Sequence, residues 1–319
     1  NARLFDETQR LLKETEQRNA ELAVINSIQQ GIAAKLDFQA IVDLASPAQR
    51  DLWLPALASG ELIAVLAHEE SGDIDTLADL QTRATKHGEG WRLDGAKALV
   101  YHAPIADLLL VSARTDEGVI ALFAVRAGSP GLILSPCLTV DDQCAASLAL
   151  APVLVVADDR LGDDAGAALQ DALDLGLAAL CAEAFGAMDR ILKATIEYSR
   201  SRVQFGKPIG SLQALQHRMA EMLMHLEQAR SMSYLATARC RDPDRAARRS
   251  ALSAAKVLMG QAARYIGQQA VQLHGGMGMT DELDVSHYFK RLLAFELRAG
   301  STDQHLAAYV RQRSPVEVD

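Results

Sequence analysis

Hydrophobic residues at helical spacing run through the first 44 positions of the chain. They recur among Glu, Gln, Lys and Arg at Leu4, Leu11, Leu12, Leu22, Ile25 and Ile28, and continue beyond Gly31 at Leu36, Phe38, Ile41 and Leu44. A stripe of this kind is typical of an amphipathic helix that buries one face. The pattern therefore predicts an amphipathic helix over residues 1–44, suited to pairing as a dimeric coiled coil.

The spacing changes to short runs between residues 46 and 162. Strand-like runs occupy 81–85, 91–93, 97–102, 108–113, 119–125 and 132–134. Turn dipeptides, including Asp94-Gly95, Glu117-Gly118 and Pro130-Gly131, separate several of these runs. Short runs punctuated by such turns predict a compact antiparallel β-domain over residues 46–162.

Helical spacing returns over residues 163–312. A long buried stripe is marked by Leu169, Leu173, Leu177, Leu180, Ala184, Met188, Ile191 and Leu192. We predict a second helix from about Leu212 to Arg241. A third begins at Pro243, where a missing N–H costs nothing, and ends at Gly275-Gly276. With the shorter helices that follow, these elements predict a four-helix bundle and an α+β fold class, followed by a tail at residues 313–319.

Composition and charge narrow the classes of function. The chain has 319 residues, enough for two or three domains, and a net charge of -9 that disfavours broad binding to nucleic acid. It contains no run of about 18 apolar residues and no signal-peptide core, so we expect a cytoplasmic protein with no membrane partner. Four unpaired thiols and no metal site are expected, because no zinc-type spacing connects Cys137, Cys144, Cys181 and Cys240.

Two segments flanking the predicted helices carry candidate chemistry. The first is Arg-Val-Gln-Phe-Gly-Lys-Pro-Ile-Gly at residues 202–210, and the second is Gln-Leu-His-Gly-Gly-Met-Gly-Met at residues 272–279. A guanidinium donates paired hydrogen bonds to phosphate oxygens, and glycine lets a ligand approach the backbone closely. Taken singly, Arg202 could be a cation near a helix C-terminus and Gly275-Gly276 a helix end.

Together these segments resemble the C-terminal domain of the acyl-CoA dehydrogenases, and residues 46–162 resemble the middle domain. The resemblance implies FAD and the α,β-dehydrogenation of an acyl-CoA thioester. It also implies a homodimer or heteromer, with electron-transfer flavoprotein as the electron acceptor. Within the FAD site it implies contacts with the diphosphate, ribose, adenine or nucleotide for Arg202, Gln204, Phe205, Gln213, Gln272, Gly275 and Gly276.

The middle domain departs from the family pattern. The family segment of the type Thr-Glu-Pro-Gly-Ala-Gly-Ser-Asp aligns with residues 68–75, so that His68 stands where the family has Thr. The Trp and Thr that the family places beside the flavin ring are replaced by Leu99 and Tyr101. Tyr101 could still present a hydroxyl, and His68 and His102 could donate to a flavin edge. The alternative is that they are ordinary polar residues at strand ends.

The implied reaction needs a carboxylate over the α-carbon of the thioester. The two family positions for this base are occupied by Ala299 and Gly176, and neither residue can take a proton. Glu296 and Glu183 are the nearest carboxylates in sequence, although solvated helix glutamates are the commoner interpretation. Further segments, at 67–69, 94–97, 181–184 and 287–291, resemble the small subunits of heteromeric bacterial acyl-CoA dehydrogenases. We therefore expect a subunit that lacks its own base and works with a base-carrying partner.

Two alternatives stay open. One is a self-sufficient enzyme that uses Glu296 or Glu183, and the other is a non-catalytic dimerisation or scaffold protein derived from the family. The family match starts near Ser46, so the N-terminal helical domain of the family is expected to have no counterpart. Residues 1–44 resemble instead a signalling helix that leads into a GAF domain. A gene fusion, a truncated gene or a joined assembly would each produce this arrangement.

Overall fold

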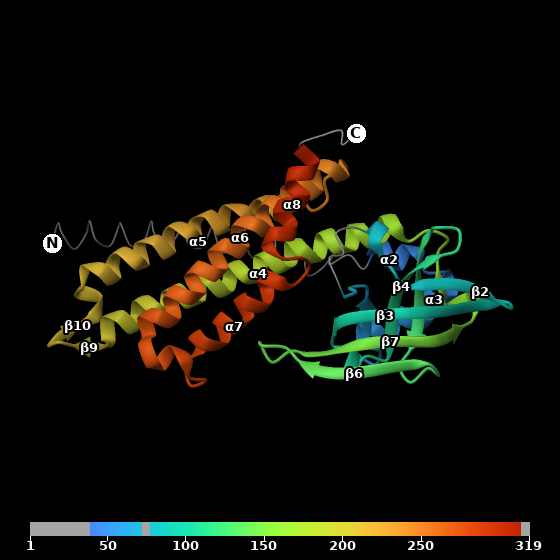
Figure 1. Cartoon of the computed structure of the whole chain (residues 1–319), viewed down its shortest axis with the longest axis horizontal. Coiled ribbons are helices and arrows are strands. Elements are labelled where there is room, and N and C mark those ends of the chain that lie inside the picture. Colours follow the sequence, from blue (N-terminus) through green and yellow to red (C-terminus); the bar gives the residue numbers. More distant parts are fainter. Residues whose placement is uncertain (1–38, 72–76, 314–319) are drawn as a thin grey trace. The chain divides into compact units, whose positions relative to one another are not determined.

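The structure is a computed structural model that describes residues 39–71 and 77–313 (Figure 1). Most of the helix predicted over residues 1–44 lies outside the described residues, as does all of the predicted tail except residue 313. The described part begins with α2 (Gln39–Leu44) and α3 (Pro47–Ser59). Helix α3 begins with a capping box, in which Ser46 and Gln49 each bond the backbone N–H of the other.

The β-domain is one mixed sheet, in the order β6-β7-β3-β2-β4-β5-β8 with β1 paired to β4. The prediction of a purely antiparallel domain is wrong for β4, which pairs in parallel with both β1 and β2. Turn dipeptides specify hairpins between neighbouring segments, but they carry no information on pairings across a crossover. The strands are β1 (Ala64–Ala67), β2 (Arg83–His87), β3 (Gly90–Tyr101), β4 (Leu108–Thr115), β5 (Ile120–Arg126), β6 (Leu132–Leu138), β7 (Cys144–Val155) and β8 (Arg160–Leu161).

Strand β3 joins two of the predicted runs into a single element that pairs with β2 and β7. Gly95 permits this continuity, because a Cβ there would lie 2.9 Å from the Cα of Thr82. The register of β3 against β7 is interrupted between Lys97 and Val100, where Leu99 has a φ of 47°. This irregularity, a β-bulge, re-aims the end of β3 toward the site described below.

The helical region contains the three long helices that the sequence predicts, together with two shorter ones. Their buried faces form one core, in which Met188, Ile191, Met259 and Ile266 are all inaccessible to solvent. A small hairpin of β9 (Val203–Gln204) and β10 (Lys207–Pro208) connects the first two helices (Figure 1). The helices are α4 (Gly166–Ser201), α5 (Gln213–Arg239), α6 (Arg245–His274), α7 (Asp284–Leu297) and α8 (Thr302–Arg313).

The start of α6 differs from the prediction that placed it at Pro243. The helix begins at Arg245, and Asp244 is its N-cap. Asp244 Oδ1 accepts hydrogen bonds from the N–H groups of Ala246 at 3.0 Å and Ala247 at 3.1 Å. None of the helices in the described ranges is long and apolar enough to cross a lipid bilayer.

We expect Asp244→Ala to lower the free energy of unfolding by about 1 kcal/mol, because two N–H groups at the start of α6 lose their acceptor. Asp244→Asn should retain most of the stability, since its side-chain oxygen can accept the same bonds. Urea denaturation of the two variants beside the wild type measures the difference. Equal stability of Asp244→Ala and the wild type would show that this cap contributes nothing.

Candidate functional site

A cavity of about 310 Å³ opens between the segment that follows β1 and one end of the bundle. Its walls come from the first turns of α4 and α6, the loop between α7 and α8, and α8 itself. The residues that line it include His68, Glu69, Asp174, Ala299 and His305. Most of them are ionisable, so the cavity suits a ligand with polar groups.

The loop between α7 and α8 is held by the buried side chain of Lys256. Its ammonium donates to the carbonyls of Phe295 at 2.8 Å, Arg298 at 2.9 Å and Gly300 at 2.7 Å. A longer contact of 3.2 Å reaches the carbonyl of Glu296. Burial lowers the pKa of Lys256 to about 8, which still leaves the group mainly protonated at pH 7. The charge therefore fixes the backbone on both sides of Ala299.

Ala299 itself has a left-handed backbone with a φ of 57°. This region is costly for a residue with a Cβ and persists only where the surroundings impose it. Beyond the Lys256 contacts, the imidazole of His305 donates from Nε2 to the Ala299 carbonyl at 2.8 Å. The loop thus keeps a specific conformation although position 299 carries only a methyl group.

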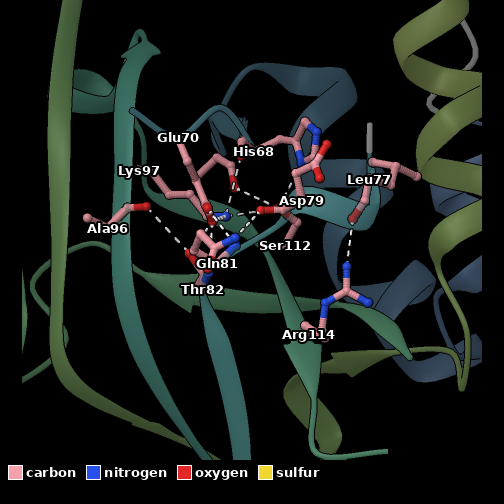
Figure 2. A network of polar contacts seen from close by, with 11 residues as sticks. His68, Glu70, Leu77, Asp79, Gln81, Thr82, Ala96, Lys97, Ser112 and Arg114 are labelled. Carbon is pink, nitrogen blue, oxygen red and sulfur yellow. Dashed lines mark hydrogen bonds and ion pairs between the residues drawn. The ribbon is translucent and has the colours of Figure 1, made fainter. Parts of the chain in front are cut away.

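The segment that follows β1 is held by a buried polar network (Figure 2). Lys97 Nζ lies 2.7 Å from the carboxylate of Glu70, and both side chains are almost fully shielded from solvent. Glu70 also accepts from the N–H groups of Gln81 at 2.7 Å and Thr82 at 3.0 Å, and from the Thr82 hydroxyl. On the other side, Lys97 donates to Ser112 Oγ at 3.2 Å. Burial lowers the pKa of Lys97 to about 8, against the opposing effect of Glu70.

Three carboxylates line the cavity, and they differ in their partners. Glu70 is paired with Lys97, and Asp174 accepts from Arg248 Nε at 2.6 Å. Glu69 forms no ion pair with any described residue. Burial raises the pKa of Glu69, while Arg298, the Ala299 N–H and Lys256 act in the opposite direction. Glu69 is thus the cavity carboxylate that is most available as a proton acceptor. Sequence reasoning missed it, although it precedes Glu70 in the segment aligned with the family's flavin-binding motif.

Of the two positions where the family carries its base, one lines the cavity and the other lies next to lining residues in sequence. Ala299 lines the cavity, and Gly176 lies on α4 between Leu173 and Leu177, which also line it. A Cβ added at Gly176 would meet no atom within 4 Å. A longer side chain at position 176 would therefore begin in open space.

The two other carboxylates considered from the sequence, Glu296 and Glu183, lie outside this cavity. Glu296 forms an ion pair of 2.9 Å with Arg264, and it is absent from the cavity lining. Glu183 lies 2.7 Å from Arg291, and it too is absent from the lining. Each carboxylate is neutralised by an arginine, so the structure brings neither of them to Ala299.

The residues predicted to hold the ADP half of FAD meet at the other end of α4. The ring of Tyr198, in the last turn of α4, stacks on His274 in the last turn of α6 with centroids 4.4 Å apart. This contact joins the segment that carries Arg202, Gln204 and Phe205 to the segment that carries Gly275. The exposed side chains at this end are Arg202, Gln204, Phe205, Gln213 and Gln272, together with the backbone of Gly275 and Gly276.

This end of the bundle fits a nucleotide diphosphate. Arg202 has no carboxylate partner among the described residues, and a Cβ on Gly275 or Gly276 would meet nothing within 4 Å. Gly275 has a φ of 58°, which glycine adopts without strain. Phe205 is 88% exposed, which is unusual for an aromatic side chain.

Tyr101, predicted to face the flavin, lies at the end of β3. The guanidinium of Arg298 sits 4.0 Å above the centroid of its ring. Arg298 directly precedes Ala299, so this contact connects the sheet to the loop held by Lys256. Tyr101 therefore belongs to the same neighbourhood as the cavity loop, far from Arg202.

Comparison with known proteins agrees with these features. The family described as "Acyl-CoA dehydrogenase, C-terminal domain" matches residues 165–312. L-prolyl-[peptidyl-carrier protein] dehydrogenase of Pseudomonas fluorescens is 34% identical over 278 residues, which cover 83% of this chain and 72% of that protein. Human mitochondrial short-chain specific acyl-CoA dehydrogenase is 29% identical, over 82% of this chain and 66% of the relative. The chain thus spans about two thirds of the length of these relatives.

Solved structures give the same result. Glutaryl-CoA dehydrogenase of Mycobacterium smegmatis in complex with FADH2 aligns with a TM-score of 0.79 and 26% identity, over 86% of this chain and 72% of that one. The ChsE4-ChsE5 complex of Mycobacterium tuberculosis aligns with a TM-score of 0.77 and 28% identity, over 87% and 73%. The fold, together with the segments at residues 202–210 and 272–279, therefore defines the class of flavin-dependent oxidoreductases. The chain belongs to the acyl-CoA dehydrogenase family, whose members bind FAD.

We expect Lys256→Met to lower the free energy of unfolding by about 3 kcal/mol, because several buried carbonyls lose their only charged donor. Lys193→Met is a matched control, since Lys193 is exposed and its pair with Asp189 should contribute less than about 1 kcal/mol. Urea denaturation followed by circular dichroism measures both. Similar losses in the two variants would contradict the role assigned to Lys256.

Proposed function

We propose that this chain takes part in the FAD-dependent α,β-dehydrogenation of an acyl-CoA thioester. The observation that carries the proposal is the combination of the exposed Arg202 and Gly275-Gly276 at one end of α4 with a polar cavity at the other. FAD, when bound, supplies the acceptor for the hydride that leaves the β-carbon. The residues of this chain would bind the cofactor, orient the thioester and control the proton on its α-carbon.

In this proposal, Arg202 binds the diphosphate through charge-assisted hydrogen bonds. Gly275 and Gly276 let the phosphates approach the backbone, and Phe205 offers an apolar surface to the adenine. The glutamines Gln204, Gln213 and Gln272 contact the remainder of the nucleotide. Tyr101 lies beside the flavin at the cavity end, where its hydroxyl serves as a polar contact.

The spacing of these residues favours an oligomer. Leu177 lines the cavity, and Arg202 follows it 25 residues later at the end of the same helix. At the helical rise this separation is about 37 Å. One FAD molecule cannot extend over that distance. We infer that Arg202 serves the cavity of a second chain, in a homodimer or heteromer, with electron-transfer flavoprotein as the electron acceptor.

The proton acceptor distinguishes two forms of the proposal. In the first, this chain lacks the base, because Ala299 and Gly176 occupy the family positions, and a partner subunit carries it. In the second, the chain is self-sufficient. The unpaired carboxylate of Glu69 in the cavity favours that alternative.

We expect the purified complex to carry FAD and to show its absorbance, and Arg202→Gln to weaken FAD binding by about 1.5–3 kcal/mol, the range for a hydrogen bond to a charged group. Lys193→Gln is a control of equal charge change, on the same helix and away from the cradle. Fluorescence titration with FAD measures the affinities. A complex that binds no FAD with any partner would favour the non-catalytic scaffold instead.

We expect Ala299→Glu to accelerate exchange of the α-protons of butyryl-CoA in D₂O by about 100-fold or more, the contribution of a positioned general base. Mass spectrometry of the recovered thioester measures the exchange.

Glu69→Gln in the otherwise wild-type chain separates the two forms of the proposal. Loss of exchange identifies Glu69 as the base, whereas unchanged exchange supports the form without a base. Glu296→Gln should have no effect, and an effect there would contradict the geometry of its pair with Arg264.

A further inference from the structure

His68 connects the buried network of the sheet to the cavity. It follows β1 directly, lines the cavity, and places its Nδ1 at 2.9 Å from Ser112 Oγ (Figure 2). Its other ring nitrogen, Nε2, has no hydrogen-bond partner among the described residues. One nitrogen of the imidazole thus hydrogen-bonds to the protein, and the other can hydrogen-bond to a ligand.

The network determines which nitrogen carries the proton. Lys97 can only donate, so Ser112 Oγ accepts at 3.2 Å and keeps its own O–H to give away. That hydroxyl has two acceptors within reach, His68 Nδ1 at 2.9 Å and the Ala67 carbonyl at 3.5 Å. The longer contact is at the limit of a hydrogen bond. The second lone pair of Ser112 Oγ could accept from an Nδ1–H, but the hydroxyl would then have only the Ala67 carbonyl at 3.5 Å as its acceptor. The shorter contact therefore favours donation from Ser112 to Nδ1 at 2.9 Å, which leaves the proton of the neutral ring on Nε2.

The direction of this chain of bonds originates at Glu70. Its carboxylate holds the Lys97 ammonium at 2.7 Å and is itself fixed by the N–H groups of Gln81 and Thr82. The ammonium occupies one lone pair of Ser112, and of the two acceptors within reach of the hydroxyl His68 Nδ1 is the nearer. Glu70 therefore sets the tautomer of His68 through two intermediate groups.

The same surroundings keep the ring uncharged. Burial is the main cause that lowers the pKa of His68 to about 4, and the nearby Lys97 ammonium adds to it. Glu70 opposes this effect without reversing it. Further ionisable residues line the same cavity, namely Glu69, Asp174, Arg249 and His305. Burial and Lys97 dominate, so His68 is neutral throughout the physiological range.

We propose that His68 is a neutral hydrogen-bond donor of the cavity, which presents Nε2–H to a carbonyl-type oxygen of the bound ligands. The oxygen is either the thioester carbonyl or the carbonyl edge of the flavin, so the identity of the acceptor rests on the proposed function. A donor placed where negative charge develops stabilises that charge strongly in a site shielded from water. At the thioester, this charge develops on the carbonyl oxygen as the α-proton leaves.

The tautomer can be measured without any turnover. The full chain, labelled with ¹⁵N-histidine, is examined by two-bond ¹H–¹⁵N correlation between pH 6 and 8. We expect the His68 ring to be neutral and protonated on Nε2 at every pH. The signals of the His68 ring are identified by their absence from the spectra of His68→Gln and of His68→Thr, which restores the family residue. Either variant suffices for this assignment if it folds well. A ring protonated on Nδ1, or an imidazolium at pH 6.5, would overturn the proposal.

Titration of the labelled chain then identifies the acceptor. A shift of the Nε2–H signal on addition of FAD alone assigns the flavin carbonyl, and a shift only after addition of butyryl-CoA assigns the thioester. No shift with either ligand would refute a donor role. Failure to bind FAD would contradict the proposed function but not the tautomer, and addition of butyryl-CoA alone would still test the thioester.

Matched variants test the consequence for chemistry. In the Ala299→Glu background, His68→Leu should slow α-proton exchange of butyryl-CoA by about 100-fold, the effect of losing one such donor. His68→Gln, whose amide can still donate, should recover part of that loss. Ser112→Ala should remove the hydrogen bond that selects the tautomer of His68, so that the spectrum shows both neutral tautomers. His87→Leu, at an exposed position in the same sheet, should match its parent, and equal effects of His68→Leu and His87→Leu would refute the role of His68.

Discussion

The contact between the Lys256 ammonium and the carbonyls of residues 295–300 is the constraint on which the candidate site depends. A loop that reverses direction between two helices leaves several carbonyl groups without helical partners. Here one buried cation satisfies them together, and in doing so it fixes Ala299 in a backbone conformation that alanine rarely adopts. Without that charge the carbonyls would face one another, and the wall of the cavity that they form would lose its shape.

The opposite wall is also held by a buried charged group, which here is an anion that collects hydrogen-bond donors. There the buried group that collects donors is the Glu70 carboxylate, which accepts from Lys97 and from the backbone of residues 81 and 82. A buried ion pair contributes little net stability, but removal of one partner is very costly. Such pairs therefore specify geometry more than they stabilise the fold. Each wall of the cavity is fixed by a buried charge, which makes the arrangement of His68, Glu69 and Ala299 specific.

Local patterns predicted the long helices of the bundle, because the stripe through Met188 and Ile191 repeats over many turns. They also predicted strands β2 to β6, but not β1, β7 or β8. They could not indicate that β4 pairs in parallel with β1 and β2, since that pairing joins segments separated by a crossover. The motif at Arg202 and the glycines at 275 and 276 pointed to one end of the bundle. Glu69 was missed because its availability depends on what its neighbours lack, and a sequence does not display the absence of an ion pair.

In the proposed function, a cavity with the His68 donor and the loop held by Lys256, but with alanine and glycine at the family's two base positions, separates two tasks that one active site usually combines. In this proposal, ligand binding needs the shape of the cavity and a neutral N–H, and both are set by buried charges. Proton removal needs only one carboxylate at the α-carbon, which can come from Glu69 or from a partner. In the form of the proposal without a base, the preorganised scaffold is the costly part of the site, and a single carboxylate at position 299 would be enough to supply the proton acceptor.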